Sequence, residues 1–344
     1  MLFRSQLTLE RVSIGKSQDV RVDSLVVPIG PVGLISGTRD FDSVEGKGVT
    51  VEPHALPVIA GWVGAPKSAP ELKINRVKLH AVKIATPVET PKFDVDAHIG
   101  SHGELRTALF EVEKARIEAT PKEKSWAIKM TAAGWKPFAG PAVEFDEIEA
   151  TGTMTGDSVH LDAIKGRVGG GAISGQLKAN WGSSIQASGD FKLENGRLAV
   201  LIPAFTRNFT ALGTLNLTAN YALGADSMKT LFDTARLEGA FTISGGELNN
   251  VDIVRALQSA RAGGQRGGKT RFDTLSGTVS VNGSHYSYRQ LQLASGPMNA
   301  NGSVDVTDGA LNGRVNAELG TKSGQVVARG SLAATGTLRD PVLR

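Results

Sequence analysis

The stretch QVVARGSLAATGTL, residues 325–338, decides the fold. Every second residue from Val326 to Leu338 is apolar or glycine, while Gln325, Arg329 and Ser331 fall on the intervening positions. Successive side chains of an extended chain point to opposite faces. The stretch therefore predicts a β-strand with one dry face and one wetter face.

The same alternation recurs along the chain, at residues 215–223, 275–281 and 304–306. Between such runs stand dipeptides that favour tight turns, because glycine and asparagine tolerate a positive φ. These are Asn195-Gly196, Gly245-Gly246, Asn282-Gly283, Asp308-Gly309 and Asn312-Gly313. The spacing predicts a mostly β fold built as a meander of antiparallel hairpins.

Helical signals are few. Asn250 is the expected N-cap of a helix whose apolar face holds Val251, Ile253, Val254, Leu257 and Ala260. Asp226 is the expected cap of a short helix through Phe232. Residues 198–209 are apolar at helical spacing but contain Pro203, which disfavours a continuous helix.

Internal repeats indicate how the strands are organised. Residues 145–177 align without gaps on residues 272–304, an offset of 127, with Phe145 on Phe272 and Gly175 on Gly302. A second, shorter repeat relates residues 189–193 to residues 239–243. Each copy is followed by a glycine turn, a leucine and a possible helix. A third links 9–14 with 74–79. Repeated units that cannot each close a core predict an extended stack.

Proline clusters at 53–70 and 87–91 read as connectors. We therefore predict two domains. The first is a hairpin-rich N-terminal segment, residues 1–140. The second is a C-terminal β domain, residues 141–344, which contains the long repeat.

Composition excludes several classes of function. The chain of 344 residues has no cysteine, which rules out thiolate metal sites, disulfides and a cysteine nucleophile. Its 38 Lys and Arg against 34 Asp and Glu are scattered, and 6% of residues are aromatic, so no nucleic-acid partner is expected. Such mild basicity suits weak attraction to anionic lipid headgroups.

Membrane and export signals are missing from the sequence as given. No run approaches the roughly 18 apolar residues that span a bilayer, and the best candidate, residues 25–35, is broken by prolines and glycines. No apolar segment follows Met1 to make a signal peptide. The expectation is either a cytoplasmic protein or an exporting segment upstream of this sequence.

One motif resembles a nucleotide site. Residues 263–270, GGQRGGKT, match the phosphate-binding pattern G-x-x-x-x-G-K-[ST]. That loop binds phosphate where a strand leads into a helix, but here the expected helix comes before the glycines and a strand follows. We predict a glycine linker and no nucleotide binding through Lys269.

Other candidate sites are weaker still. The glycines at 169–175 have the wrong spacing for a dinucleotide loop and read as strand and turn. His98 and His102 could share a metal on a helix, but residues 94–99 alternate like a strand, which favours solvent-facing histidines. No nucleophile, base and orienting group can be assembled. We expect no enzyme activity, no cofactor and no metal.

The apolar strand faces remain. They can be the inside of a sandwich or barrel, or a groove that holds lipid tails, because large exposed apolar patches are rare without a function. Composition alone does not decide between core and lipid.

An ordered series of segments from residue 211 to 344 resembles the C-terminal region of the AsmA family. In family order these are GTLNL (213–217), LEGAFTI (237–243), GGEL (245–248), VDI (251–253), TRFDTLSG (270–277), GSVDV (302–306) and GTLRDP (336–341). A glycine-rich gap separates the fourth from the fifth. The N-terminal part resembles the family only in its general sequence character, in LERVSI (9–14) and RVDSL (21–25).

The resemblance implies an elongated, curved antiparallel sheet of repeated hairpins with an apolar groove. It also implies a periplasmic protein, associated with the inner membrane of a Gram-negative bacterium, that handles phospholipid or another acyl lipid in outer-membrane biogenesis. The family's membrane helix is missing from this sequence. Protein partners stay unknown. The alternative is a non-catalytic structural or adhesin-like β-repeat module.

The predicted groove takes its lining from apolar positions of the C-terminal strands. They are Val279, Val281, Leu291, Leu293, Val304, Val306, Leu332 and Leu338.

Overall fold

The computed structural model describes residues 5–15, 18–29, 40–52, 55, 73–85, 91–123, 125–258, 264–321, 323 and 325–344. Most of the predicted proline connectors fall outside these residues. The chain divides into two compact units, Met1–Phe138 with Ile148–Asp162, and Ala139–Glu147 with Ala163–Arg344. We call them the N-terminal unit and the C-terminal unit.

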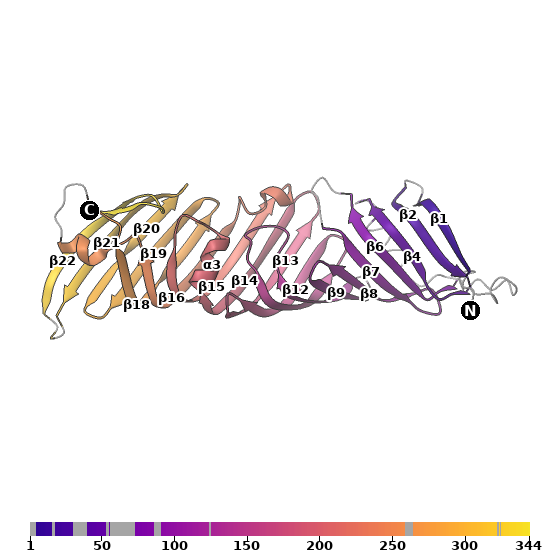
Figure 1. The fold of residues 1–344 in the computed structure, drawn as a ribbon, viewed down its shortest axis with the longest axis horizontal. Coiled ribbons are helices and arrows are strands. Elements are labelled where there is room, and N and C mark those ends of the chain that lie inside the picture. Colours follow the sequence, from indigo (N-terminus) through magenta and orange to yellow (C-terminus); the bar gives the residue numbers. More distant parts are fainter. Residues whose placement is uncertain are drawn as a thin grey trace. The chain divides into compact units, whose positions relative to one another are not determined.

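The N-terminal unit is an open sheet of hairpin strands (Figure 1). Each strand pairs with the next one named here: β1 (Ser5–Ile14), β2 (Val20–Ile29), β4 (Val44–Val51), β6 (Arg76–Ile84), β7 (Phe93–Ile99), β8 (Leu105–Val112), β9 (Ala115–Pro121) and β10 (Trp126–Trp135). One pairing, β4 with β6, is parallel. The short strands β3 (Asp40–Phe41) and β5 (Lys73–Ile74) also pair in parallel. These two parallel pairs are exceptions within a sheet that is otherwise antiparallel, as the sequence predicted.

The C-terminal unit continues the hairpin pattern with antiparallel neighbours only. Its strands are β13 (Gly171–Trp181), β14 (Ile185–Arg197), β15 (Ala211–Ala225), β16 (Arg236–Asn249), β17 (Gln265–Arg266), β18 (Lys269–Asn282), β19 (His285–Ser295), β20 (Met298–Thr307), β21 (Ala310–Gly320), β22 (Val326–Gly336) and β23 (Pro341–Leu343). Between the units in sequence stand β11 (Phe145–Met154) and β12 (Ser158–Val168), whose residues are divided between them.

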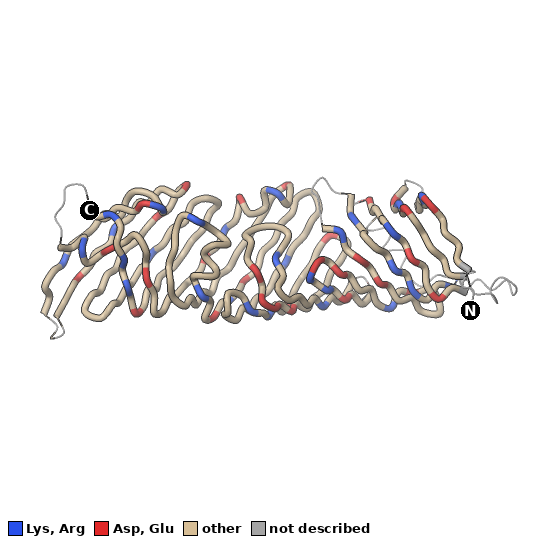
Figure 2. Tube along the Cα trace, in the orientation of Figure 1, with Lys and Arg blue, Asp and Glu red and all other residues tan. Residues whose placement is uncertain are grey.

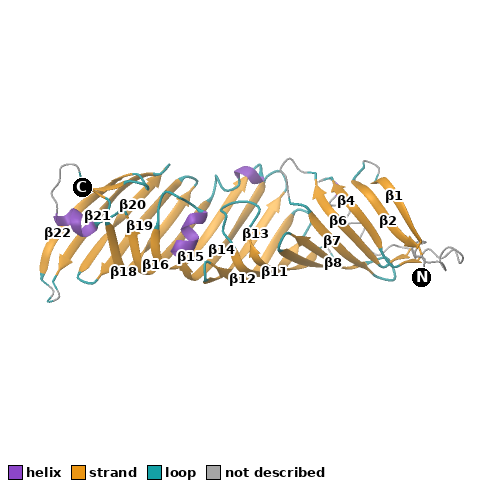
Figure 3. Cartoon of the chain, viewed as in Figure 1, coloured by secondary structure: helices purple, strands orange, loops and turns teal. Residues whose placement is uncertain are grey.

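Helices are few and short in the described part of the chain, as Figure 3 shows. They are α3 (Leu198–Leu201), η2 (Ile202–Ala204), η3 (Met228–Thr230) and α4 (Ile253–Gln258). The predicted mostly β fold of repeated hairpins is thus confirmed. All three expected segments contain helical residues, and the expected continuation of the last one through Ala260 lies outside the described residues.

The cap of α4 differs from the prediction. Asn250 has φ +64° and lies before the helix. Asp252 caps it instead, because its Oδ1 accepts a hydrogen bond from the Arg255 amide at 2.9 Å. The Thr270 hydroxyl oxygen accepts a second one from the Ile253 amide at 3.1 Å.

The sheet of the C-terminal unit curves back on itself beyond β18. Strand β17 pairs with β23, yet only Gly267 and Gly268 separate it from β18. Three residue steps reach at most about 11 Å, whereas five strand spacings along a flat sheet cover about 24 Å. The strands from β18 to β23 must therefore bend round, and the ion pair Arg266–Asp340 lies beside the β17–β23 pairing.

Helix α4 packs inside this bend. Ile253 and Ala256 share a buried cluster with Phe272, Leu293 and Leu332 and with five further residues, Met298, Ala300, Ala317, Ala334 and Leu343. A smaller cluster under α3 joins Leu201 to Leu193 and Val168. Each helix therefore covers one part of one face of the sheet.

Three predicted turns proved to be strand interior. Asn195-Gly196 lies inside β14, where its pairing with β15 shifts register. Gly245-Gly246 lies inside β16, opposite a second register shift in β15. Asn195 and Gly245 have φ +60° and +58°, which a β-bulge needs as much as a turn does. Asn312-Gly313 lies within β21. The turns at Asn282-Gly283 and Asp308-Gly309 are confirmed.

The long repeat is confirmed in its strand order. Adding 127 to the bounds of β12 gives those of β19, and β11 and β13 map in the same way onto β18 and β20. A similar contact recurs one position earlier in the second window, where Pro297 aligns with Gly170 and Gly296 donates instead. The Asp146 carboxylate accepts a hydrogen bond from the Gly170 amide at 3.3 Å, and the Asp273 carboxylate accepts one from Gly296 at 2.9 Å. That Ile164 and Leu291 share a face stays a prediction.

Candidate functional site

The apolar face of the C-terminal unit is its most unusual feature. Cross-strand partners join same-face residues into four rows that run across the strands, numbered from the Asn282-Gly283 turn. Row 1 is Leu177, Gly189, Tyr221, Leu237, Val281, Tyr286, Val306 and Leu311. Row 2 is Gly175, Phe191, Ala219, Gly239, Val279, Tyr288, Val304, Gly313 and Ala334. Row 3 is Ile173, Leu193, Leu217, Phe241, Gly277, Leu291, Gly302, Val315 and Leu332, and row 4 is Leu215, Ile243, Leu275, Leu293, Ala300, Ala317 and Gly330.

None of these row residues is charged or carries an amide side chain. Row 2 crosses nine strands, so it extends about 38 Å when followed along the sheet at the usual strand spacing. Row 3 passes a bulge between β18 and β19, where Leu291 leans over Gly277. The result is an unbroken apolar surface.

Seven of the eight predicted groove residues lie on these rows. The eighth, Leu338, follows the end of β22, and its amide donates to the Gly309 carbonyl oxygen at 3.0 Å. Pairwise register thus brings together residues that lie far apart in the sequence, such as Val281 and Val306, which both flank Tyr286.

Burial divides the seven into two groups. Leu293, Leu332 and Val306 are buried, and the first two belong to the cluster that contains α4. They therefore serve as core, and the prediction that they line an open groove does not match this packing. Val279, Val281, Leu291 and Val304 are only half-buried.

No second layer of sheet covers the half-buried part among the described residues. A fully packed interior would bury such valines and leucines almost completely. The sequence predicted the two helical segments but not which part of the face each one covers, because burial by a helix depends on tertiary contact and not on strand alternation.

The opposite face is polar and charge-paired. Arg289 donates to Asp305 at 2.7 Å, and Arg329 donates to Glu318 at 2.6 Å. Arg289 and Ser287 hold the pKa of Asp305 below its usual value by hydrogen bonding. Figure 2 shows positive and negative residues interspersed along the strands.

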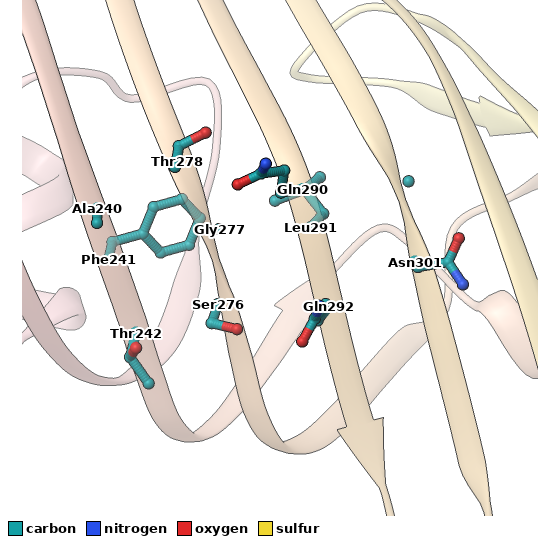
Figure 4. Close-up of a pocket in the computed structure, with 11 residues that line it drawn as sticks. Ala240, Phe241, Thr242, Ser276, Gly277, Thr278, Gln290, Leu291, Gln292 and Asn301 are labelled. Atoms are coloured by element: carbon teal, nitrogen blue, oxygen red, sulfur yellow. The ribbon is translucent and has the colours of Figure 1, made fainter.

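A shallow hollow of about 730 Å³ lies on this polar face (Figure 4). Thr242, Ser276, Gln292 and Asn301 form one wall, in register across four strands. The floor is the backbone of row 3, because its side chains point to the other face. The hollow is therefore separate from the apolar rows.

The glycine loop before Lys269 is structural. Helix α4 precedes it and strand β18 follows it, which confirms the predicted order. Lys269 Nζ donates to Glu247 at 2.7 Å, Arg271 donates to the same carboxylate at 3.1 Å, and these bonds lower the pKa of Glu247. The Thr270 hydroxyl donates to the Val251 carbonyl oxygen at 2.7 Å.

Lys269 and Thr270 are thus engaged within the fold. Absence of nucleotide binding stays a prediction. Calorimetry with ATP and magnesium should detect no saturable heat, and saturable binding that disappears in Lys269→Ala would contradict it.

The remaining candidates form no site in the described ranges. His98 lies in strand β7, as predicted, with half its side chain exposed, and His102 lies in the turn after it. Gly169 and Gly170 form the two-residue turn of the β12–β13 hairpin, with φ +57° and +78°. No group of three or more potential metal ligands occurs among the described residues. Nor does any described helix have the length and apolarity needed to cross a membrane.

Comparison of the chain with family models, curated proteins and solved structures finds no match to any of them. The resemblance to the AsmA family therefore stays a prediction from the sequence.

Proposed function

We propose that this chain is a lipid-handling protein of the bacterial envelope, in which the apolar face of the C-terminal unit holds the acyl chains of phospholipid. The resemblance of residues 211–344 to the AsmA family motivates this reading. In this proposal the protein lies in the periplasm, associated with the inner membrane, and acts as a conduit without enzymatic activity.

One observation carries the proposal. Rows 1 to 3 cross eight or nine strands without a charged side chain, and many of their residues are only half-buried. Contiguous apolar surface of more than a few hundred Å² rarely faces water without a function. Acyl chains match it, because they remove apolar area from water and need no specific partner.

The covered part of the face favours a second candidate, a structural β-repeat module. Under α4 the same rows form ordinary core, with Leu293 and Leu332 each 6% exposed. If a further protein layer covered the rest, no lipid would be involved.

Lipid content decides between the two. Wild-type protein isolated from bacterial envelopes should carry phospholipid, detected by native mass spectrometry and by solvent extraction. Lipid-free protein that also takes no phospholipid from vesicles would favour the structural module.

A further inference from the structure

All three tyrosines of the chain lie on the apolar face of the C-terminal unit. Tyr221 and Tyr286 belong to row 1 and Tyr288 to row 2. Their hydroxyls are the only polar side-chain groups on the four rows.

The three hydroxyls differ in their partners. Tyr221 donates to the Gln176 carbonyl oxygen at 3.2 Å, and burial raises its pKa to about 12. Neither Tyr286 nor Tyr288 donates a hydrogen bond to any residue that the structure describes. Apart from the hydroxyl of the other tyrosine, their neighbours on the rows supply no side-chain acceptor, since these are aliphatic, glycine or phenylalanine.

Tyr288 is fixed in this apolar setting. It stands between Val279 and Val304 in register, and its ring packs edge-on against Phe241, with centroids 6.3 Å apart at 87°. Burial raises the pKa of Tyr288 above its ordinary value, at which a tyrosine hydroxyl is already a neutral donor at physiological pH. Tyr286, two residues nearer the Asn282-Gly283 turn, is 40% exposed.

We propose that the hydroxyls of Tyr286 and Tyr288 donate hydrogen bonds to the ester carbonyls of a diacyl lipid whose tails lie along rows 1 and 2. This inference rests on the proposed function and names the chemical group that the groove selects. The headgroup would then lie toward the exposed Tyr286 end of the pair.

The chemistry of the two groups is complementary. A phenol donates and an ester carbonyl accepts, and a half-buried hydroxyl gains from a partner that an apolar wall cannot supply. Same-face residues two apart on a strand are separated by roughly 7 Å. The two carbonyls of a diacyl lipid leave adjacent glycerol carbons, so one lipid can engage both tyrosines.

The test uses two phosphatidylcholines with identical tails, one ester-linked and one ether-linked. Full-length protein is incubated with vesicles that contain both in equal amounts, and bound lipid is identified by native mass spectrometry. Because the ether lipid lacks both carbonyl acceptors, wild type should favour the ester lipid by roughly tenfold.

In Tyr286→Phe/Tyr288→Phe the ester preference should fall to about one, with uptake of ether lipid unchanged. Tyr221→Phe is the matched control and should keep the wild-type preference, because its hydroxyl is engaged internally. If wild type bound ester and ether lipid equally, or if the double variant kept the wild-type ester preference, this inference would be overturned while the proposed function would stand. Uptake of neither lipid by wild type would overturn the proposed function with it.

Discussion

Val304→Glu should deplete the protein of phospholipid while leaving its fold intact. Val304 is half-buried in row 2, between Tyr288 and Gly313. A carboxylate there can reach water when the face is empty, but acyl chains would strip that water away. Because an uncompensated buried charge costs several kcal/mol, bound phospholipid should fall at least about tenfold.

The matched control is Ser303→Glu, one residue earlier. Its side chain points to the polar face, where Arg314 is its cross-strand neighbour. It adds the same charge to the same strand, so its lipid content and thermal midpoint should equal those of wild type. Unfolding of Val304→Glu alone would mean that row 2 is core, and unchanged lipid in Val304→Glu would mean that lipid binds elsewhere.

Phe272→Ala should strongly destabilise the C-terminal unit. Phe272 is 4% exposed and belongs to the cluster that joins α4 to the curved end of the sheet. Removing a buried phenylalanine side chain typically costs about 3–5 kcal/mol. The thermal midpoint should fall by roughly 10 °C, since about 2–4 °C accompanies each kcal/mol in a unit of this size.

Phe205→Ala is the corresponding control. Phe205 is 66% exposed, so its loss should change the free energy of unfolding by no more than about 0.5 kcal/mol. Differential scanning calorimetry of both variants measures the contrast. Equal losses, or a loss below about 1 kcal/mol for Phe272→Ala, would show that α4 does not close a core.

Period-two alternation carried most of the fold prediction. It located β15, β18, β20 and β22, and it selected seven residues that share one face, because the side-chain period of a strand is fixed by backbone geometry. The 127-residue repeat was equally readable, since it compares the chain with itself and requires no knowledge of contacts.

The errors have a common physical origin in glycine and asparagine. Asn195-Gly196 and Gly245-Gly246 signal a positive φ, and both a hairpin turn and a bulge use it. Only the pairing partner decides which forms. At Gly246 an added Cβ would lie 2.2 Å from the Phe272 ring, a crowding that no sequence pattern reveals.

Contacts between distant segments were also beyond the sequence. The parallel pairing of β4 with β6 depends on the path of the intervening chain. The division of the apolar face into core and half-exposed surface depends on where α4 packs. For the same reason Leu293 and Leu332, predicted to line the groove, belong to the core.

Site-specific photo-cross-linking tests the lipid-groove proposal most directly. A photoreactive phenylalanine analogue is placed singly at Val279, Ser280 and Val281, three successive positions of β18 that alternate between the two faces. If acyl chains lie on rows 1 and 2, positions 279 and 281 should cross-link to tail-labelled phospholipid and position 280 should not. Equal labelling at all three positions, or none at 279 and 281, would contradict the proposal.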